Sequence, residues 1–222
     1  MSQRILAVAP HPDDETLGCG GTLLRMSEQG EELAWLIVTG ISEDQGFPVQ
    51  RVRERDAEIA RVVKTIGFRK VFNLGLPAAR LDRIPMADLI EKFSEVFKAF
   101  APHQVFLPYR SDVHTDHREV FDAGSACVKW FRYPSIQRVL AYETLSETEL
   151  TLDPREVFQP NYFVNVSQFL ERKIELMSIY RSELGDYPFP RSVTAIRALA
   201  QVRGAASGFE AAEAFQLLRE RY

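Results

Sequence analysis

The sequence predicts an α/β fold in which helices flank a mainly parallel sheet and a helical extension follows at the C-terminus. Short apolar runs alternate with longer amphipathic segments through the first two thirds of the 222 residues, and this pattern changes after Glu143. Such alternation is typical of βαβ units, whose crossover helices cover a parallel sheet. We therefore expect a Rossmann-like arrangement.

Six apolar runs are predicted as strands. They are short, rich in β-branched residues and separated by segments long enough for crossover helices. They are Ile5–Ala9, Leu33–Thr39, Lys70–Asn73, Val105–Leu107, Val139–Tyr142 and YFVNV at 162–166.

The segments between the first strands carry apolar residues at helical spacing. GTLLRMSEQG (21–30) ends on a glycine suited to a helix C-terminus, and two longer segments repeat the amphipathic pattern. These are RVRERDAEIARVVKTIGF (51–68) and IPMADLIEKFSEVFKAF (84–100).

The chain shows no internal division. It has no sequence repeat, low-complexity tract or Gly/Ser linker, and the roughly 70 residues after position 150 are few for an independent domain. We expect residues 1–222 to form a single domain, with C-terminal helices after Ser167, from Val193 and from Ala211.

Composition and charge exclude several classes of protein. A formal charge of −4 provides no electrostatic footprint for nucleic acid. No window reaches the ~18 apolar residues of a membrane span, and acidic residues interrupt any N-terminal signal pattern, so a cytoplasmic protein without a membrane segment is predicted. Cys19 and Cys127 have no CxxC partner, which disfavours a disulfide framework and a thiolate metal site.

Residues capable of chemistry follow two of the predicted strands. APHPDDETLGCGG (9–21) places His11, Asp13 and Asp14 after the first strand, and YRSDVHTDH (109–117) places His114 and His117 after the run VFL. Ligands bind at the carboxyl ends of the strands in open α/β sheets. The two groups of residues share one crevice if their strands are neighbours.

These residue types suit a catalytic metal site. His11 and Asp14 offer a nitrogen and an oxygen ligand, and one histidine of HTDH could complete a His₂Asp set with an open position, as in catalytic zinc sites. Asp13 then remains free as a general base and the second histidine as an acid. The pattern predicts metal-dependent hydrolysis, with Zn²⁺ or with Fe²⁺, Co²⁺ or Mn²⁺, which the same ligands tolerate.

The paired motifs resemble those of the PIG-L/LmbE-like zinc-dependent N-deacetylases. HPDDE after a first strand, a glycine-rich turn and a later HTDH carry the resemblance. RDAEIARVVKTIG (55–67) and RGAASGFEAAEAF (203–215) resemble further segments of that family. The resemblance implies an LmbE-like domain that removes acetate from an N-acetylglucosaminyl group and leaves a free amine.

The resemblance also implies roles for five residues. His11, Asp14 and His117 would hold Zn²⁺. Asp13 would be the general base that takes a proton from the water at the metal. His114 would stabilise the oxyanion or protonate the leaving amine.

Orientation and substrate recognition involve further positions. By the same resemblance, Asp116 would orient His114, and Arg55 would contact substrate hydroxyl groups. The family often places an aspartate where this chain has Ala78, and the nearest carboxylate, Asp82, lies four positions later. This departure concerns sugar recognition rather than hydrolysis.

Other polar residues have a structural explanation. Glu15 suits the macrodipole at a helix start, Asp112 suits a turn, and the glycines of GCGG suit close packing of a helix on a strand. Three C-terminal arginines are expected to be solvated or to pair with local acids rather than to bind an anion: Arg191, Arg197 and Arg203.

Three functions remain open from the sequence. They are a deacetylase of small amino-sugar substrates, an amidase acting with the same site on a thiol conjugate or a longer acyl group, and a metal- or sugar-binding protein without catalysis. The third is disfavoured because binding alone needs neither Asp13 nor His114. The aromatic stretch KWFRYPS (129–135) suits either a lid or a contact in a homo-oligomer.

Overall fold

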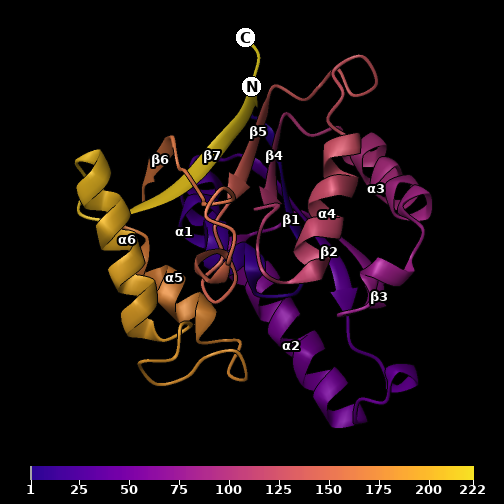
Figure 1. Cartoon of the computed structure of the whole chain (residues 1–222), viewed down its shortest axis with the longest axis horizontal. Helices are drawn as coiled ribbons and strands as arrows, with labels where there is room; N and C mark the ends of the chain where they lie inside the picture. Colours follow the sequence, from indigo (N-terminus) through magenta and orange to yellow (C-terminus); the bar gives the residue numbers. More distant parts are fainter. Residues whose placement is uncertain (1) are drawn as a thin grey trace.

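A seven-stranded sheet forms the frame of the computed structural model, which describes residues 2–222 (Figure 1). The strand order is β3-β2-β1-β4-β5-β7-β6. The first five strands run parallel, whereas β7 lies antiparallel to both β5 and β6. Their bounds are β1 Arg4–Ala9, β2 Glu32–Gly40, β3 Lys70–Pro77, β4 Gln104–Pro108, β5 Arg138–Tyr142, β6 Tyr162–Asn165 and β7 Ala212–Glu220.

Helices cover both faces of the sheet because successive strand residues point to opposite sides. Ile5 and Ala7 of β1 pack in one core cluster with α1, α2, α5 and α6, while Leu6 and Val8 pack in another with α3 and α4. In Figure 1, α3 and α4 lie together on one side and α5 and α6 on the other. The helices are α1 Asp14–Glu28, α2 Val49–Ile66, α3 Met86–Phe100, α4 Thr115–Ala126, α5 Leu170–Met177 and α6 Val193–Ser207.

The α/β prediction and all six predicted strands are confirmed. The helix predicted from Ala211 is wrong, because this segment forms strand β7 between β5 and β6. Phe215 of β7 pairs with Tyr142 on one side and with Tyr162 on the other. Backbone partners on both edges override the helix propensity of a segment rich in Ala, Glu and Leu.

Gly18 and Gly21 of α1 allow the helix to pack closely on its neighbours, as predicted, whereas Gly20 has only ordinary contacts. A Cβ atom built on Gly18 would lie 2.1 Å from Cδ2 of Tyr142. The helix is kinked at Cys19, where φ is −141° and ψ is 16°. Close packing and the kink together fix the N-terminal turn of α1, which carries Asp14.

A buried ion pair supports the segment of α1 beyond the kink. The carboxylate of Glu213 accepts hydrogen bonds from the backbone N–H groups of Gly21 (2.8 Å) and Thr22 (2.7 Å). Lys173 lies 2.6 Å from the same carboxylate and also donates to the carbonyl of Leu17. Strand β7 and helix α5 therefore anchor α1 through charge as well as through packing.

The structure also bears on the two cysteines and on the length of the helices. Cys19 and Cys127 are both buried and free. Every helix within residues 2–222 is too short or too polar to cross a bilayer.

Candidate active site

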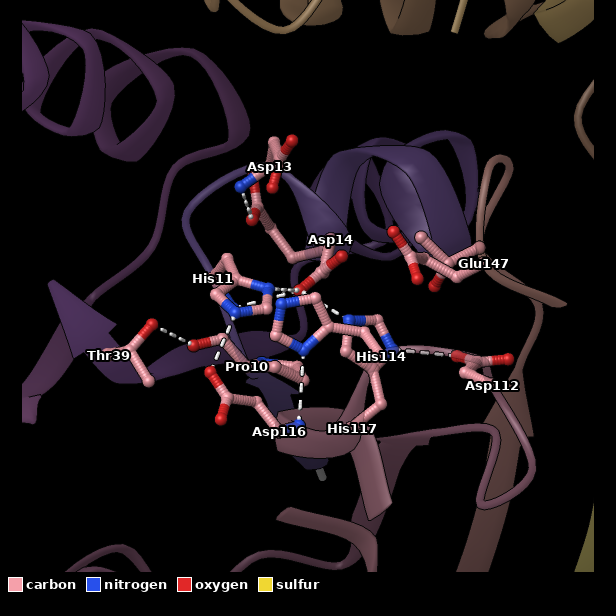
Figure 2. A network of polar contacts seen from close by, with 12 residues as sticks. Pro10, His11, Asp13, Asp14, Thr39, Asp112, His114, Asp116, His117 and Glu147 are labelled. Atoms are coloured by element: carbon pink, nitrogen blue, oxygen red, sulfur yellow. Dashed lines mark hydrogen bonds and ion pairs between the residues drawn. The ribbon is translucent and has the colours of Figure 1, made fainter. Parts of the chain in front are cut away.

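The two groups of polar residues predicted from the sequence meet in one crevice. β1 and β4 pair in parallel at the point where the strand order reverses, so the loops that follow them emerge at the same edge of the sheet. The ring centroids of His11 and His114 are 4.5 Å apart. Figure 2 shows both loops directed at a common centre.

His11, Asp14 and His117 present three ligand atoms to that centre. Oδ2 of Asp14 lies 3.2 Å from Nδ1 of His11 and 3.4 Å from Nε2 of His117. The three ligand atoms lie within 4.8 Å of one another. Nε2 of His117 is buried and has no hydrogen-bond partner among residues 2–222. A buried ring nitrogen left unpaired beside a carboxylate oxygen fits a divalent cation as its partner.

In both His11 and His117, the ring nitrogen that does not face Asp14 contacts another carboxylate. Nδ1 of His117 lies 2.7 Å from Oδ2 of Asp112, and Nε2 of His11 lies 3.1 Å from Oδ2 of Asp116. Such partners fix the ring orientation and the tautomer of a metal-binding histidine. The sequence interpretation of Asp112 as a turn residue missed this contact, since an offset of five residues from His117 follows no ligand pattern.

A second group, His11, His114 and Asp116, also satisfies the distance criterion for a metal site. Its acceptor atoms already have partners, because the Asp116 carboxylate accepts from the backbone N–H groups of Ala79 (2.7 Å) and Leu81 (3.2 Å). Nδ1 of His114 accepts the backbone N–H of Asp116 at 3.1 Å. Asp116 therefore orients His114 through its backbone, while its carboxylate contacts His11.

His114 is held as a neutral ring with its proton on Nε2. Because Nδ1 accepts a backbone N–H at the start of α4, that nitrogen carries no proton. Burial lowers the pKa of His114, and the nearby His11 lowers it further. The Nε2–H group is thus a hydrogen-bond donor toward the crevice rather than a source of a proton.

Asp13 lies beside the ligands without joining them (Figure 2). Its φ of 141° and ψ of −27° place it in a region that L-residues rarely adopt. Burial raises the pKa of Asp13 well above its usual range, and the charge of Asp14 raises it further. A buried carboxyl group of raised pKa is suited to accept and return a proton.

The histidine and carboxylate ligands hold opposite charges in the metal-free protein. Burial acts to lower the pKa of His11, but hydrogen bonds to Asp116 and Asp14 overcome this and raise it to about 9. Burial acts to raise the pKa of Asp14, but the charge of His117 and hydrogen bonds to both histidines lower it. A divalent cation would take the place of the protons on these rings.

A cavity of about 270 Å³ opens onto these residues. Its wall includes Arg191 and two acidic side chains that the sequence did not connect with the site, Glu147 and Glu183. Glu147 follows β5, and burial raises the pKa of its carboxyl group. The two acidic residues lie in loops far from either motif in the sequence, so no local signal predicted them.

Comparison with known proteins identifies the family. The family model described as "PIG-L: GlcNAc-PI de-N-acetylase" matches residues 6–128, which hold both motifs. The chain belongs to the PIG-L family. By membership it is an enzyme of the deacetylase class, a hydrolase.

Relatives of this PIG-L protein match it over nearly its whole length. Diacetylchitobiose deacetylase from Thermococcus kodakarensis is 25% identical over 97% of this chain and 83% of its own. The conserved protein TT1542 from Thermus thermophilus is 28% identical and superimposes with a TM-score of 0.79, covering 99% of this chain and 97% of the other. A 4-carboxy-2-hydroxymuconate hydratase from Pseudomonas putida has a TM-score of 0.74 at 15% identity, covering 99% and 98%. The fold alone therefore does not determine the reaction.

Three residues considered for sugar recognition in this PIG-L member lie in different places. Arg55 lines the cavity, and each of its nitrogens contacts a protein oxygen. Nη1 donates to the carbonyl oxygen of Pro12, while Nη2 and Nε contact the carboxylates of Glu183 and Glu58. Ala78 also lines the cavity, whereas Asp82 is exposed on the short helix η2 (Leu81–Arg83).

The three C-terminal arginines also lie in different places, with one at the cavity and two away from it. Arg197 and Arg203 form ion pairs with Glu171 and Glu143, as predicted. Arg191 also pairs with a local acid, since Nη2 lies 3.6 Å from Oε2 of Glu183, but unlike the other two it lines the cavity and donates to the hydroxyl of Ser146 at 2.7 Å.

The aromatic stretch KWFRYPS cannot form a lid over this cavity. It precedes β5 and so lies at the amino ends of the parallel strands, whereas the cavity lies at their carboxyl ends. Trp130 and Phe131 are exposed.

Proposed function

We propose that this PIG-L protein is a metal-dependent N-deacetylase that removes the acetyl group from an N-acetylglucosaminyl-type amino sugar. The observation that carries the proposal is the His11–Asp14–His117 group with Asp13 and His114 left free beside it. The name of the Thermococcus kodakarensis relative supports an acetylated amino sugar as the substrate class. A cavity of about 270 Å³ suits a small-molecule substrate.

Zn²⁺ is the proposed ion, with Fe²⁺, Co²⁺ and Mn²⁺ as ions that the same ligands accept. His11, Asp14 and His117 would hold it, and the unpaired Nε2 of His117 supports this assignment. When bound, the ion would polarise the amide carbonyl and lower the pKa of the attacking water.

Asp13 performs the proton transfers in the proposed reaction. Its carboxylate takes a proton from water as the water oxygen bonds to the acetyl carbon. It then returns this proton to the amide nitrogen as the C–N bond breaks, which releases the free amine and acetic acid, ionised to acetate. The raised pKa of Asp13 supports both transfers, since a weaker acid holds the proton between them.

His114 stabilises the negative charge that develops on the amide oxygen. Its Nε2–H group supplies a fixed hydrogen-bond donor, and such donors contribute strongly to acyl-transfer catalysis. The neutral tautomer favours this role over protonation of the leaving amine, because Nδ1 is already occupied by the backbone N–H of Asp116.

Metal content and acetate release, measured on the same samples, test the proposal. Purified wild type is compared with His117→Ala and Asp13→Ala, using N-acetylglucosamine-containing substrates. We expect about one metal per chain in wild type, loss of metal and turnover in His117→Ala, and retained metal without turnover in Asp13→Ala. An active Asp13→Ala protein would remove the general-base assignment.

The same measurement separates the competing functions. Metal without acetate release, but with release of other acyl groups from thiol conjugates or longer amides, would favour an amidase of different specificity. Metal with tight sugar binding and no turnover of any amide would favour a binding protein. A folded wild type without metal would contradict the proposed site.

A further inference from the structure

The peptide group between Pro12 and Asp13 is held at both of its polar atoms. Its carbonyl oxygen, on Pro12, accepts a hydrogen bond from Nη1 of Arg55 at 2.8 Å. Its N–H group, on Asp13, donates to Oε2 of Glu15 at 3.0 Å. Glu15 is 0% exposed and Arg55 is 9% exposed, so water does not replace either contact freely.

This peptide has an unfavourable orientation without these contacts. Asp13 has a φ of 141°, a value tolerated by glycine and costly for a residue with a Cβ atom. Half a turn of the peptide would bring Asp13 into the right-handed helical region, since its ψ of −27° is already helical. The observed orientation therefore requires groups that hold it.

The residues behind Glu15 complete the support. Its carboxylate also accepts the hydroxyl groups of Tyr180 (3.0 Å) and Thr16, so three donors converge on it. The guanidinium of Arg55 lies over the ring of Tyr180, 5.5 Å from its centroid. Glu15 is fully buried and does not line the cavity, and the N–H of Asp13 links its carboxylate to the reacting groups. A role at the helix macrodipole does not explain this arrangement.

We propose that Glu15 and Arg55 form a clamp on the Pro12–Asp13 peptide and that this clamp positions Asp13 for proton transfer. Both are positioning residues that act through Asp13, and the inference rests on the proposed function. The clamp gives Arg55 a different role from contact with substrate hydroxyl groups. The two roles differ in whether kcat or KM changes when Arg55 is replaced.

Paired substitutions at Glu15 test the clamp. Glu15→Gln keeps a carbonyl oxygen that can accept the N–H of Asp13, whereas Glu15→Leu has similar size and no acceptor. We expect Glu15→Leu to lower kcat by about 100-fold, the loss typical of a small misplacement, with KM and metal content unchanged. Glu15→Gln should recover most of kcat. Glu28→Leu, at an exposed position of the same helix, is the matched control and should behave as wild type.

A double-mutant cycle shows whether Glu15 acts through Asp13. In an Asp13→Asn background, Glu15→Leu should cause no further loss of residual turnover. If the two substitutions lowered turnover independently, so that their effects multiplied, the clamp would be overturned. Loss of metal in Glu15→Leu, or an equal loss of kcat in Glu15→Gln and Glu15→Leu, would overturn it as well. Full activity of Asp13→Asn would instead remove the general-base assignment of the proposed function, whatever the Glu15 result.

Arg55→Gln provides a second test if Glu15→Leu does not fold. The clamp predicts a lower kcat at unchanged KM and metal content. A raised KM at unchanged kcat would return Arg55 to substrate binding and contradict its place in the clamp.

Discussion

Oδ2 of Asp112 lies 2.7 Å from Nδ1 of His117, and this contact determines which ring nitrogen faces Asp14. Both residues are buried, and the second oxygen of Asp112 accepts the hydroxyl of Thr148 at 2.6 Å. Because Nδ1 is engaged by a carboxylate, Nε2 is the nitrogen that would offer its lone pair to a cation once its proton is displaced. Asp112 therefore supports the candidate site through the ring of His117.

Replacing Asp112 is expected to weaken metal binding. Asp112→Ala frees the ring of His117 and should lower the affinity for Zn²⁺ or Co²⁺ by roughly 10–100-fold, as for other carboxylates behind metal-binding histidines. Competition with a chelator of known affinity measures the change. Asp122→Ala, which breaks an ion pair with Arg110 near the surface, is the control and should bind metal as wild type does. Equal affinity in both variants would contradict the role of Asp112.

The affinity for metal should rise with pH up to about 9. The pKa of His11 in the metal-free protein is raised to about 9 by Asp116 and Asp14 against the effect of burial, so below that pH a cation must displace a proton. The raised pKa also stabilises the metal-free fold below pH 6.5, and this contribution is lost as pH rises through 9. The difference in melting temperature between the protein with metal and the protein without it should therefore increase from pH 6.5 to 9. A constant difference would show that His11 does not bind the cation.

The sequence predicted the parts of the site that depend on local spacing. His11 and Asp14 stand three positions apart in one turn, and His114 and His117 repeat this spacing at the start of a helix. The alternating pattern placed both groups at the carboxyl ends of parallel strands. It did not determine that β1 and β4 are neighbours, which is a property of the strand order.

Contacts between distant loops were not predictable in the same way. The partner of the Asp116 carboxylate is His11, 105 positions earlier, whereas the family resemblance implied His114. Glu15 showed only the signal of an acidic residue at a helix start, because its partner Tyr180 lies 165 positions away. The segment after Ala211 has the composition of a helix and becomes a strand because β5 and β6 supply partners on both edges.

Gly18 and Gly20 should respond differently to the same substitution. A Cβ on Gly18 would overlap the ring of Tyr142, so Gly18→Ala should lower the free energy of unfolding by about 1–3 kcal/mol. A Cβ on Gly20 meets its nearest neighbour, Cγ2 of Thr16, at 3.5 Å, which is ordinary contact. Gly20→Ala should keep or raise stability by up to ~1 kcal/mol, since alanine favours helix. Urea denaturation measures both, and equal losses would contradict close packing at Gly18.

The Lys173–Glu213 pair should matter for stability rather than for turnover. Glu213→Gln leaves the buried ammonium of Lys173 without a counter-charge and should cost about 3–5 kcal/mol of unfolding free energy. The double variant Lys173→Met/Glu213→Gln removes both charges and should recover part of this loss. Urea denaturation of the three proteins gives the comparison, and kcat of the folded fraction should stay near wild type, because neither side chain lines the cavity. If the double variant were no more stable than Glu213→Gln, the loss would come from the hydrogen bonds to Gly21 and Thr22 rather than from the uncompensated charge.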